Sequence, residues 1–154
     1  MTDVVSAAVR SRMMSSIRGR DTKPELVVRQ FLHGRGFRFR LSRRDLPGRP
    51  DLTLPRRSAV VLVHGCFWHG HHGCRFATVP STRREFWEAK IDSNRKRDAD
   101  VVARLLDLGW RVGVVWECAL KASAASALQR LEAFLLSNAR QVEVSGVPQA
   151  PMNE

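Results

Sequence analysis

Cysteine and acidic residues are scarce in this 154-residue chain, and long apolar runs are absent. Three cysteines, an odd number, argue against a framework of disulfides and favour thiols that bind metal in a reducing compartment. No stretch approaches the ~20 apolar residues that a membrane-spanning helix needs, so we expect no membrane segment. The N-terminal residues MTDVVSAAVRSRMM lack the positive-then-apolar pattern of a secretory signal, which favours a cytoplasmic protein.

Basic residues, by contrast, are abundant. The 26 lysines and arginines outnumber 15 aspartates and glutamates, which gives a formal net charge of +11 and a sequence pI near 11.2. Such an excess favours a nucleic acid as partner, because each phosphate that the protein neutralises releases condensed counterions. The alternative is a solvated basic surface that only keeps the protein soluble, and charge alone does not distinguish DNA from RNA.

Length and an apolar content of 44% are typical of one domain, which we place at residues 1–140, followed by a disordered tail at 141–154. Apolar periodicity predicts helices over 6–19, 21–36, 81–109 (with a break near 92–94) and 119–139, and strands over 37–41, 51–54, 59–65 and 110–117. This order predicts an α/β fold, a mixed central β-sheet flanked by helices.

The turn PRRS between two of these strands fixes a register. If Leu54 pairs with Ala59, Asp51 lies opposite position 62 and within reach of Val63 and His64. A carboxylate beside a backbone carbonyl and imidazoles suits Mg²⁺. The alternative is that Asp51 only caps the turn that follows Pro50.

The segment HGCFWHGHHGC, residues 64–74, holds four of the five histidines and two of the three cysteines. Cys66 and Cys74, a histidine between them and Cys118 after the strand at 110–117 match a closed Cys₃His site, which is typical of structural zinc. His71 and His72 are equally good candidates for the fourth ligand. The alternative is a set of unconnected buried thiols and surface histidines.

The segments IRGRDTKPE, LPGRPD, HGCFWHGHHGC, EFWEAKI and GWRVGVVWECAL together resemble the very-short-patch-repair (Vsr) DNA mismatch endonucleases, over roughly residues 5–122. The resemblance implies a PD-(D/E)XK nuclease-like fold in its Vsr variant. It also implies an enzyme that nicks double-stranded DNA 5′ of the thymine in the T:G mismatches left by deamination of 5-methylcytosine. The alternatives are a related nuclease with other mismatch or site specificity, and a zinc-stabilised DNA-binding protein without catalysis.

By the same resemblance, Asp51 would bind catalytic Mg²⁺ through its side chain and Val63 through its backbone carbonyl, while His69 would be the general base. Other residues would hold waters around that ion, namely Glu25, His64 and Asp98. The Glu/Asp-x-Lys half of the nuclease motif is absent here, so the role of its lysine passes to His69 or to a metal.

The zinc ligands implied by the resemblance are Cys66, His71, Cys74 and Cys118. Phe67, Trp68 and Trp87 would enter the base stack from the major groove, and Met14, on an N-terminal helix within residues 1–20, would enter from the minor groove. The expected partners are a T:G-mismatched duplex and mismatch-repair proteins, and the expected state is a monomer.

Overall fold

The computed structural model describes residues 22–147. Its helices are α2 (Lys23–Gly34), α3 (Arg84–Asp107) and α4 (Glu117–Leu136), with short 3₁₀ turns at Pro55–Arg57 and Arg75–Ala77. Its strands are β1 (Arg40–Leu41), β2 (Leu52–Leu54), β3 (Ala59–His64), β4 (Arg111–Trp116) and β5 (Gln141–Val144). The N-terminal helix expected from the sequence, and Met14 on it, lie outside the described residues.

The five strands form one sheet in the order β1-β2-β3-β4-β5. The pairs β1–β2 and β2–β3 are antiparallel, whereas β3–β4 and β4–β5 are parallel. Helix α3 makes the crossover from β3 to β4, and α4 makes the crossover from β4 to β5. The predicted mixed sheet flanked by helices is therefore confirmed.

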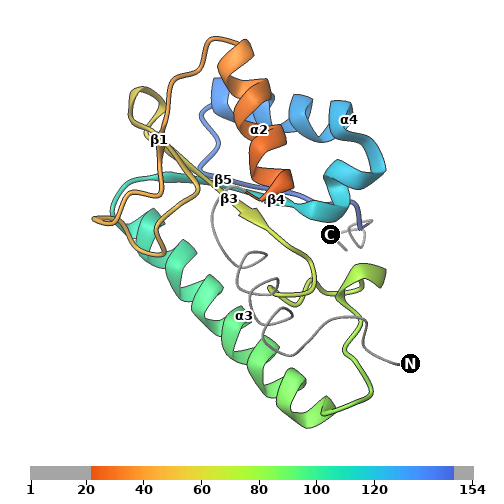
Figure 1. The fold of residues 1–154 in the computed structure, drawn as a ribbon. Coiled ribbons are helices and arrows are strands. Elements are labelled where there is room, and N and C mark those ends of the chain that lie inside the picture. The colour runs from red at the N-terminus through yellow and green to blue at the C-terminus, as the bar shows by residue number, and fades with distance from the viewer. Residues whose placement is uncertain (1–21, 148–154) are drawn as a thin grey trace, which may run out of the picture.

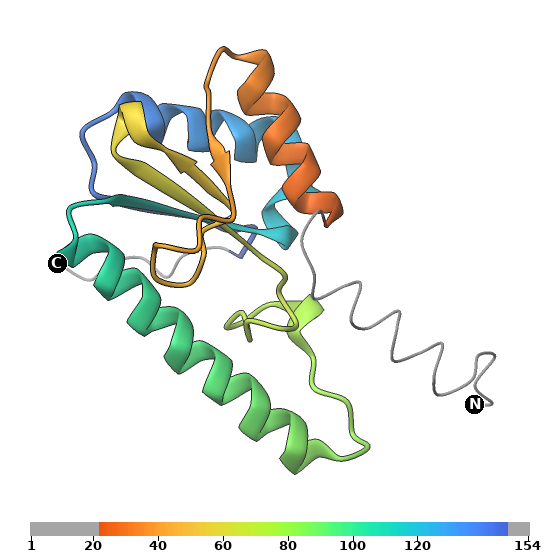
Figure 2. The ribbon, with the colours of Figure 1, turned by 60° about the vertical axis from the view of Figure 1, so that its left-hand side comes forward.

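Helices cover both faces of the sheet: α2 and α4 lie on one side and α3 on the other (Figures 1 and 2). Side chains alternate along a strand, so Val61 of β3 packs in the core under α2 and α4, whereas Val60 and Leu62 pack in the core under α3. Every residue of β3 is buried, as expected for a central strand with both faces covered. Because its side chains alternate, β3 ends with His64 on the α3 side of the sheet.

The register predicted for the β2–β3 hairpin is confirmed. Leu54 pairs with Ala59 and Leu52 pairs with Val61. The connection is a single 3₁₀ turn that closes at Ser58, which has φ 50° in the left-handed region. This short connection fixes the position of Asp51, the residue just before β2, against the end of β3.

Three expectations about the elements were wrong. Residues 141–144 are not a disordered tail but the edge strand β5, which pairs with β4 from Val112↔Gln141 to Val115↔Val144. A four-residue strand gives little signal in sequence, and here pairing with a central strand and burial of Val144 stabilise it. Helix α3 is also continuous through residues 92–94, and the first strand is confined to Arg40–Leu41. In the described part of the chain, no helix is both long and apolar enough to cross a membrane.

Candidate active site and metal centre

Asp51 lies beside the end of β3, as the hairpin register predicts. The backbone N–H of Val63 donates a hydrogen bond to Oδ2 of Asp51, with an N···O distance of 2.7 Å. The pKa of Asp51 is raised to about 7, chiefly by burial and also by the nearby charge of Glu25, whereas the Val63 bond, His69 and Arg29 act in the opposite direction. A carboxyl group in this position is costly to ionise without a cation, which is a property of metal-binding carboxylates.

Glu25 supplies a second carboxylate near Asp51. It lies in the first turn of α2, which begins after the N-cap Thr22, and its side chain is buried. Arg29, one turn further along the helix, donates to Oε2 of Glu25 at 3.1 Å. Helix α2 therefore brings an acidic group to the end of the sheet where β2 begins and β3 finishes.

Two histidines stack at this end of the sheet. The rings of His64 and His69 are parallel, at 5°, with their centroids 3.9 Å apart. Burial, and then the charge of His69, lower the pKa of His64 to about 3, so His64 is a neutral imidazole at physiological pH. Its Nδ1 is buried and has no hydrogen-bond partner within residues 22–147. A buried nitrogen of this kind is a candidate partner for an ordered water.

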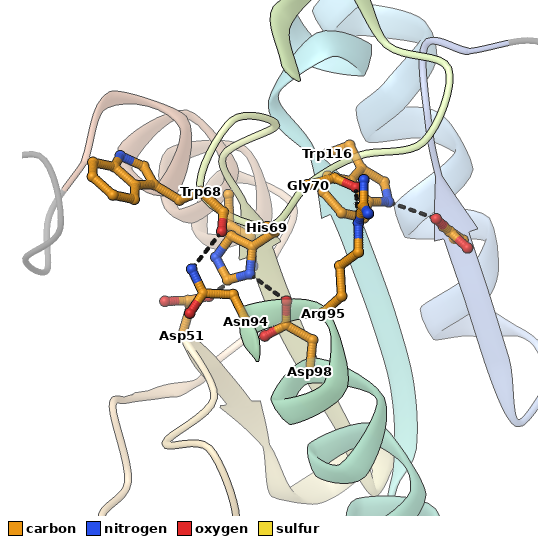
Figure 3. A network of polar contacts seen from close by, with 10 residues as sticks. Asp51, Trp68, His69, Gly70, Asn94, Arg95, Asp98 and Trp116 are labelled. Carbon is orange, nitrogen blue, oxygen red and sulfur yellow. Dashed lines mark hydrogen bonds and ion pairs between the residues drawn. The ribbon is translucent and has the colours of Figure 1, made fainter. Parts of the chain in front are cut away.

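His69 is oriented by Asp98 of α3. The distance between Nδ1 of His69 and Oδ2 of Asp98 is 2.6 Å, and both side chains are partly exposed. Because a carboxylate only accepts, this bond places the imidazole proton on Nδ1 and leaves Nε2 as the basic nitrogen. Figure 3 shows the His69 ring between Asp51 and Asp98. The arrangement can orient a general base next to a cation-binding carboxylate.

The predicted cysteine and histidine ligands come together at a second centre. Ligand atoms of Cys66, His71, Cys74 and Cys118 all lie within 4.8 Å of one another. The Sγ of Cys118 is 3.4 Å from Nδ1 of His71. Typical Zn–S and Zn–N bond lengths in a tetrahedron give a ligand-to-ligand distance of roughly 3.5 Å, so the cluster has the dimensions of a four-ligand metal site.

The structure selects His71 over His72 for this cluster. His71 is only 7% exposed, its Nε2 lies 3.0 Å from Oγ of Ser145, and its ring stacks on Trp116 at 3.9 Å. His72 is exposed. The hydroxyl of Ser145 fixes one ring nitrogen and so directs the other, Nδ1, at the thiols.

Electrostatics also favours a cation between the cysteines. Burial, and the proximity of Cys118, raise the pKa of the Cys66 thiol. Its Sγ nevertheless accepts a hydrogen bond from the backbone N–H of Cys118 at 3.3 Å, and the N–H of Gly146 points at Sγ of Cys118 at 3.3 Å. Backbone donors aimed at buried sulfurs stabilise thiolates, and a bound metal would supply the opposite charge that they need.

Phe67, Trp68 and Trp87 form a separate aromatic group. Their ring centroids lie 5.0 to 5.8 Å apart, and each of the three residues is partly exposed. In the described part of the chain they belong to neither of the two apolar cores. The rings are therefore available at the surface next to His69.

One open groove joins these features. It has a volume of about 1130 Å³ and is lined by Asp51, His69 and Asp98 together with Phe67 and Trp68. The basic residues among those that line it are Lys23, Arg44, Arg49, Lys90 and Arg97. A groove lined by carboxylates, imidazoles and cations suits a polyanion that must also meet a metal ion.

Sequence reasoning missed two residues of α3 that hold this region. Asn94 and Arg95 donate to backbone carbonyls of the segment 65–74 (Figure 3). Polar residues inside a long helix carry no local signal for a contact with a loop more than 20 positions away in sequence.

Comparisons with known proteins relate the chain to one family of DNA-nicking enzymes. A family model described as DNA mismatch endonuclease Vsr matches residues 2–75. The chain is 51% identical over 120 residues to the type II nicking enzyme V.XorIIP of Xanthomonas oryzae pv. oryzae, covering 78% of this chain and 88% of that protein. It is 42% identical over 153 residues to the DNA mismatch endonuclease Vsr of Escherichia coli K12, covering 96% of this chain and 97% of that protein. The type II nicking enzyme V.NmeAIP of Neisseria meningitidis is 42% identical over 124 residues, covering 80% and 88%.

Proposed function

Because this chain belongs to the Vsr family of DNA mismatch endonucleases, we propose that it nicks double-stranded DNA 5′ of the thymine in T:G mismatches by Mg²⁺-dependent hydrolysis. The chain is an endonuclease, the activity for which its family is named, and its relatives are named as a DNA mismatch endonuclease and as type II nicking enzymes. The observation that carries the finer proposal is the placement of Asp51 and the His69–Asp98 pair in one groove.

Hydrolysis of a phosphodiester needs an activated water, neutralised phosphate charge and a stabilised leaving oxygen. A bound Mg²⁺ would supply charge neutralisation and lower the pKa of water. In this chain the side chain of Asp51 and the backbone carbonyl of Val63 would hold the ion, and Glu25, His64 and Asp98 would surround it with hydrogen-bonding groups. The raised pKa of Asp51 and the unpartnered Nδ1 of His64 within residues 22–147 support this assignment.

His69 would accept the proton of the attacking water through Nε2. Asp98 keeps the other ring nitrogen protonated and holds the plane of the ring. In PD-(D/E)XK nucleases, which we propose as the wider class of this fold, a lysine stands near the metal, and this chain has His69 in that region instead. The mixed sheet, with the acid Asp51 just before strand β2 of the β2–β3 hairpin, supports the assignment of the fold to this wider class.

A structural Zn²⁺ at Cys66, His71, Cys74 and Cys118 would fix both ends of the segment that carries His69. A structural zinc needs no position for water or substrate, and the four side chains would fill a tetrahedral coordination shell. The ion would therefore stabilise the segment and take no part in the reaction.

Mismatch recognition would come from Phe67, Trp68 and Trp87 entering the base stack. Unstacking a base step costs a few kcal/mol and least at a mispair, so a wedge of rings selects sites where the duplex is already weak. The exposure of these rings beside the groove supports this role. Residues 22–147 hold one such set of groups, which suits a monomer that cuts one strand.

A strand-specific nicking assay tests the proposal. Duplexes with one T:G mismatch, labelled on either strand, are incubated with and without Mg²⁺, in parallel with other mismatches and several flanking sequences. We expect one nick, on the thymine strand, that needs Mg²⁺ and is lost in Asp51→Ala, whereas Asp107→Ala, which removes an exposed carboxylate, cuts normally. Equal cutting of other mismatches or of a fully paired site would replace the T:G specificity with that of a related nuclease.

A further inference from the structure

Helix α3 contacts three consecutive residues of the segment 65–74. Nδ2 of Asn94 donates to the carbonyl of Trp68 at 2.8 Å, and Nε of Arg95 donates to the carbonyl of Gly70 at 2.6 Å. Between them, the side chain of His69 bonds Asp98 at 2.6 Å. Figure 3 shows all three contacts made from one helix to one short stretch of chain. Two of them hold the backbone on either side of His69, and the third holds its ring.

Gly70 also packs closely against side chains of α3. Gly70 has φ 58°, in the left-handed region, and a Cβ on it would lie 2.3 Å from Cγ2 of Ile91 and 2.5 Å from Nε of Arg95. Only glycine fits at this position, because any other side chain would collide with Ile91 and Arg95 of α3. The backbone at residue 70 therefore rests directly on the helix.

These contacts are separate from the metal cluster. The cluster takes its ligands at residues 66, 71 and 74, whereas the helix holds residues 68–70, between the first two of these. Within that stretch the backbone N–H groups of His69 and Gly70 donate to the carbonyls of Gly65 and Phe67, both at 3.2 Å, and the bonds from Asn94 and Arg95 tie this turn to the helix. The ring of Trp68 and the imidazole of His69 project from this fixed stretch.

We propose that Asn94 and Arg95 are positioning residues that hold the backbone of 68–70 so that base unstacking by Trp68 and proton transfer at His69 occur in one fixed geometry. This inference rests on the proposed function. Asn94 lines the groove and Arg95 does not, and the side-chain bond of each goes to the backbone at Trp68 or Gly70, so both act through the positions of Trp68 and His69. Asn94, Arg95 and Asp98 thus make α3 the support that couples recognition to cleavage.

Arg95 differs from the cations that face the DNA groove. Lys90 and Arg97, on the same helix, line the groove, whereas Arg95 is partly buried with its Nε committed to the Gly70 carbonyl. A phosphate contact contributes to the slope of log affinity against log salt, by about 0.9 per contact for B-DNA. Loss of Arg95 should leave that slope unchanged and lower the rate at which the enzyme–DNA complex is nicked.

The test uses the variants Asn94→Ala, Arg95→Gln and Arg95→Lys in the full-length, zinc-loaded protein. Lys96→Ala and Arg104→Gln are matched controls, because both remove a cation from exposed i,i+4 pairs on the same helix. Single-turnover nicking of the T:G duplex with saturating enzyme is measured with the affinity, its salt slope and hydrogen exchange of a peptide spanning 65–74.

We expect Asn94→Ala and Arg95→Gln to lower the single-turnover rate by about 10- to 100-fold, since a misplacement of about 1 Å at a reacting group has an effect of that size. Affinity and salt slope should change less than threefold, and exchange of the 65–74 peptide should accelerate while that of β3 and β4 does not. Arg95→Lys, which keeps a donor and the charge, should recover part of the rate. A normal rate in both variants, or an equal loss in Arg104→Gln, would overturn the proposal, as would a reduced salt slope in Arg95→Gln.

Failure of the wider function gives a different result. If the wild type does not nick T:G duplexes, the proposed function fails, and hydrogen exchange still reports whether Asn94 and Arg95 hold the segment. If the wild type nicks and the variants nick equally well, the function stands and the positioning role fails. Unchanged exchange in both variants would refute the role whatever the substrate.

Discussion

Replacing Asp98 with asparagine tests how His69 works as a base. The carboxylate accepts from Nδ1 of His69 at 2.6 Å, and this bond leaves Nε2 free to take a proton. An asparagine has nearly the same shape, but it is neutral and its amide nitrogen donates. If that nitrogen faces the ring, the imidazole adopts the other tautomer and Nε2 carries the proton already. The variant therefore keeps the geometry and removes the function of the base.

The magnitude follows from two contributions. A hydrogen bond to a charged group contributes about 1.5–3 kcal/mol, which corresponds to roughly 10- to 150-fold in rate when the imidazole becomes charged in the transition state. The wrong tautomer adds to this, and the same substitution in the serine protease triad lowers kcat by about 10⁴-fold. Partial exposure of both side chains lets water replace some of the lost interaction. We expect nicking by Asp98→Asn to fall by about 10²- to 10⁴-fold.

The measurement is single-turnover nicking of the thymine strand with enzyme in excess, together with DNA affinity and zinc content. Asp100→Asn is the matched control, because Asp100 is an exposed carboxylate on the same helix. Affinity for the duplex should stay equal or rise, since the variant loses a negative charge in the groove that we propose binds DNA. A rate within threefold of the wild type, with zinc and affinity intact, would refute the assignment of His69 and Asp98 as base and orienting acid.

Three further outcomes are expected. The wild type should contain about one zinc per chain, and Cys118→Ser should lose most of it and melt at a lower temperature. His72→Ala, which changes an exposed neighbour, should keep its zinc. Elemental analysis after dialysis checks both variants, and a zinc-free wild type would contradict the site. Trp68→Ala should lower the preference for T:G over T:A duplexes more than it lowers nonspecific affinity, and competition binding that shows an unchanged preference would speak against the wedge. Burial raises the pKa of Asp51 to about 7. In metal-free buffer the protonated carboxyl therefore contributes to the free energy of unfolding below about pH 4, and this contribution is lost as the pH rises through 7. At pH 8, Asp51→Asn should thus be more stable to urea than the wild type by about 1–3 kcal/mol, and Mg²⁺ should stabilise only the wild type; equal stability without Mg²⁺ would count against the buried charge.

Much of the fold could be predicted because its signals are local. The buried strands at 59–64 and 111–116 are short apolar runs, and the turn PRRS gives the hairpin register from counting alone. That register predicts Asp51 beside Val63, and the hydrogen bond between them confirms it. The strand β5 was missed because its stability comes from pairing with β4, which its own four residues do not encode.

The site divides in the same way. Residue types and spacing within HGCFWHGHHGC indicated ligands and a base, and these residues do gather into two clusters. The roles assigned to all of these residues in catalysis, metal binding and DNA recognition stay predictions, and Met14 lies outside the described residues. Asn94 and Arg95 carried no recognisable signal, because a polar residue on a helix reads as solvent-exposed until its partner is known.

The sequence by itself determined the chemistry available to this protein: a basic chain, a mixed sheet, a carboxylate at the start of one strand and a short segment rich in imidazole and thiol groups. Only the tertiary structure decided which of those groups meet. It placed His71 rather than His72 in the cluster, through burial against Trp116 and a bond to Ser145. It also brought in Cys118 from the first turn of α4, just after β4, and placed Asp98 of α3 against His69. The physical reason is that residue types and spacing are local properties, whereas ligand geometry and desolvation depend on segments that are distant in sequence and adjacent only after the sheet and its covering helices have packed.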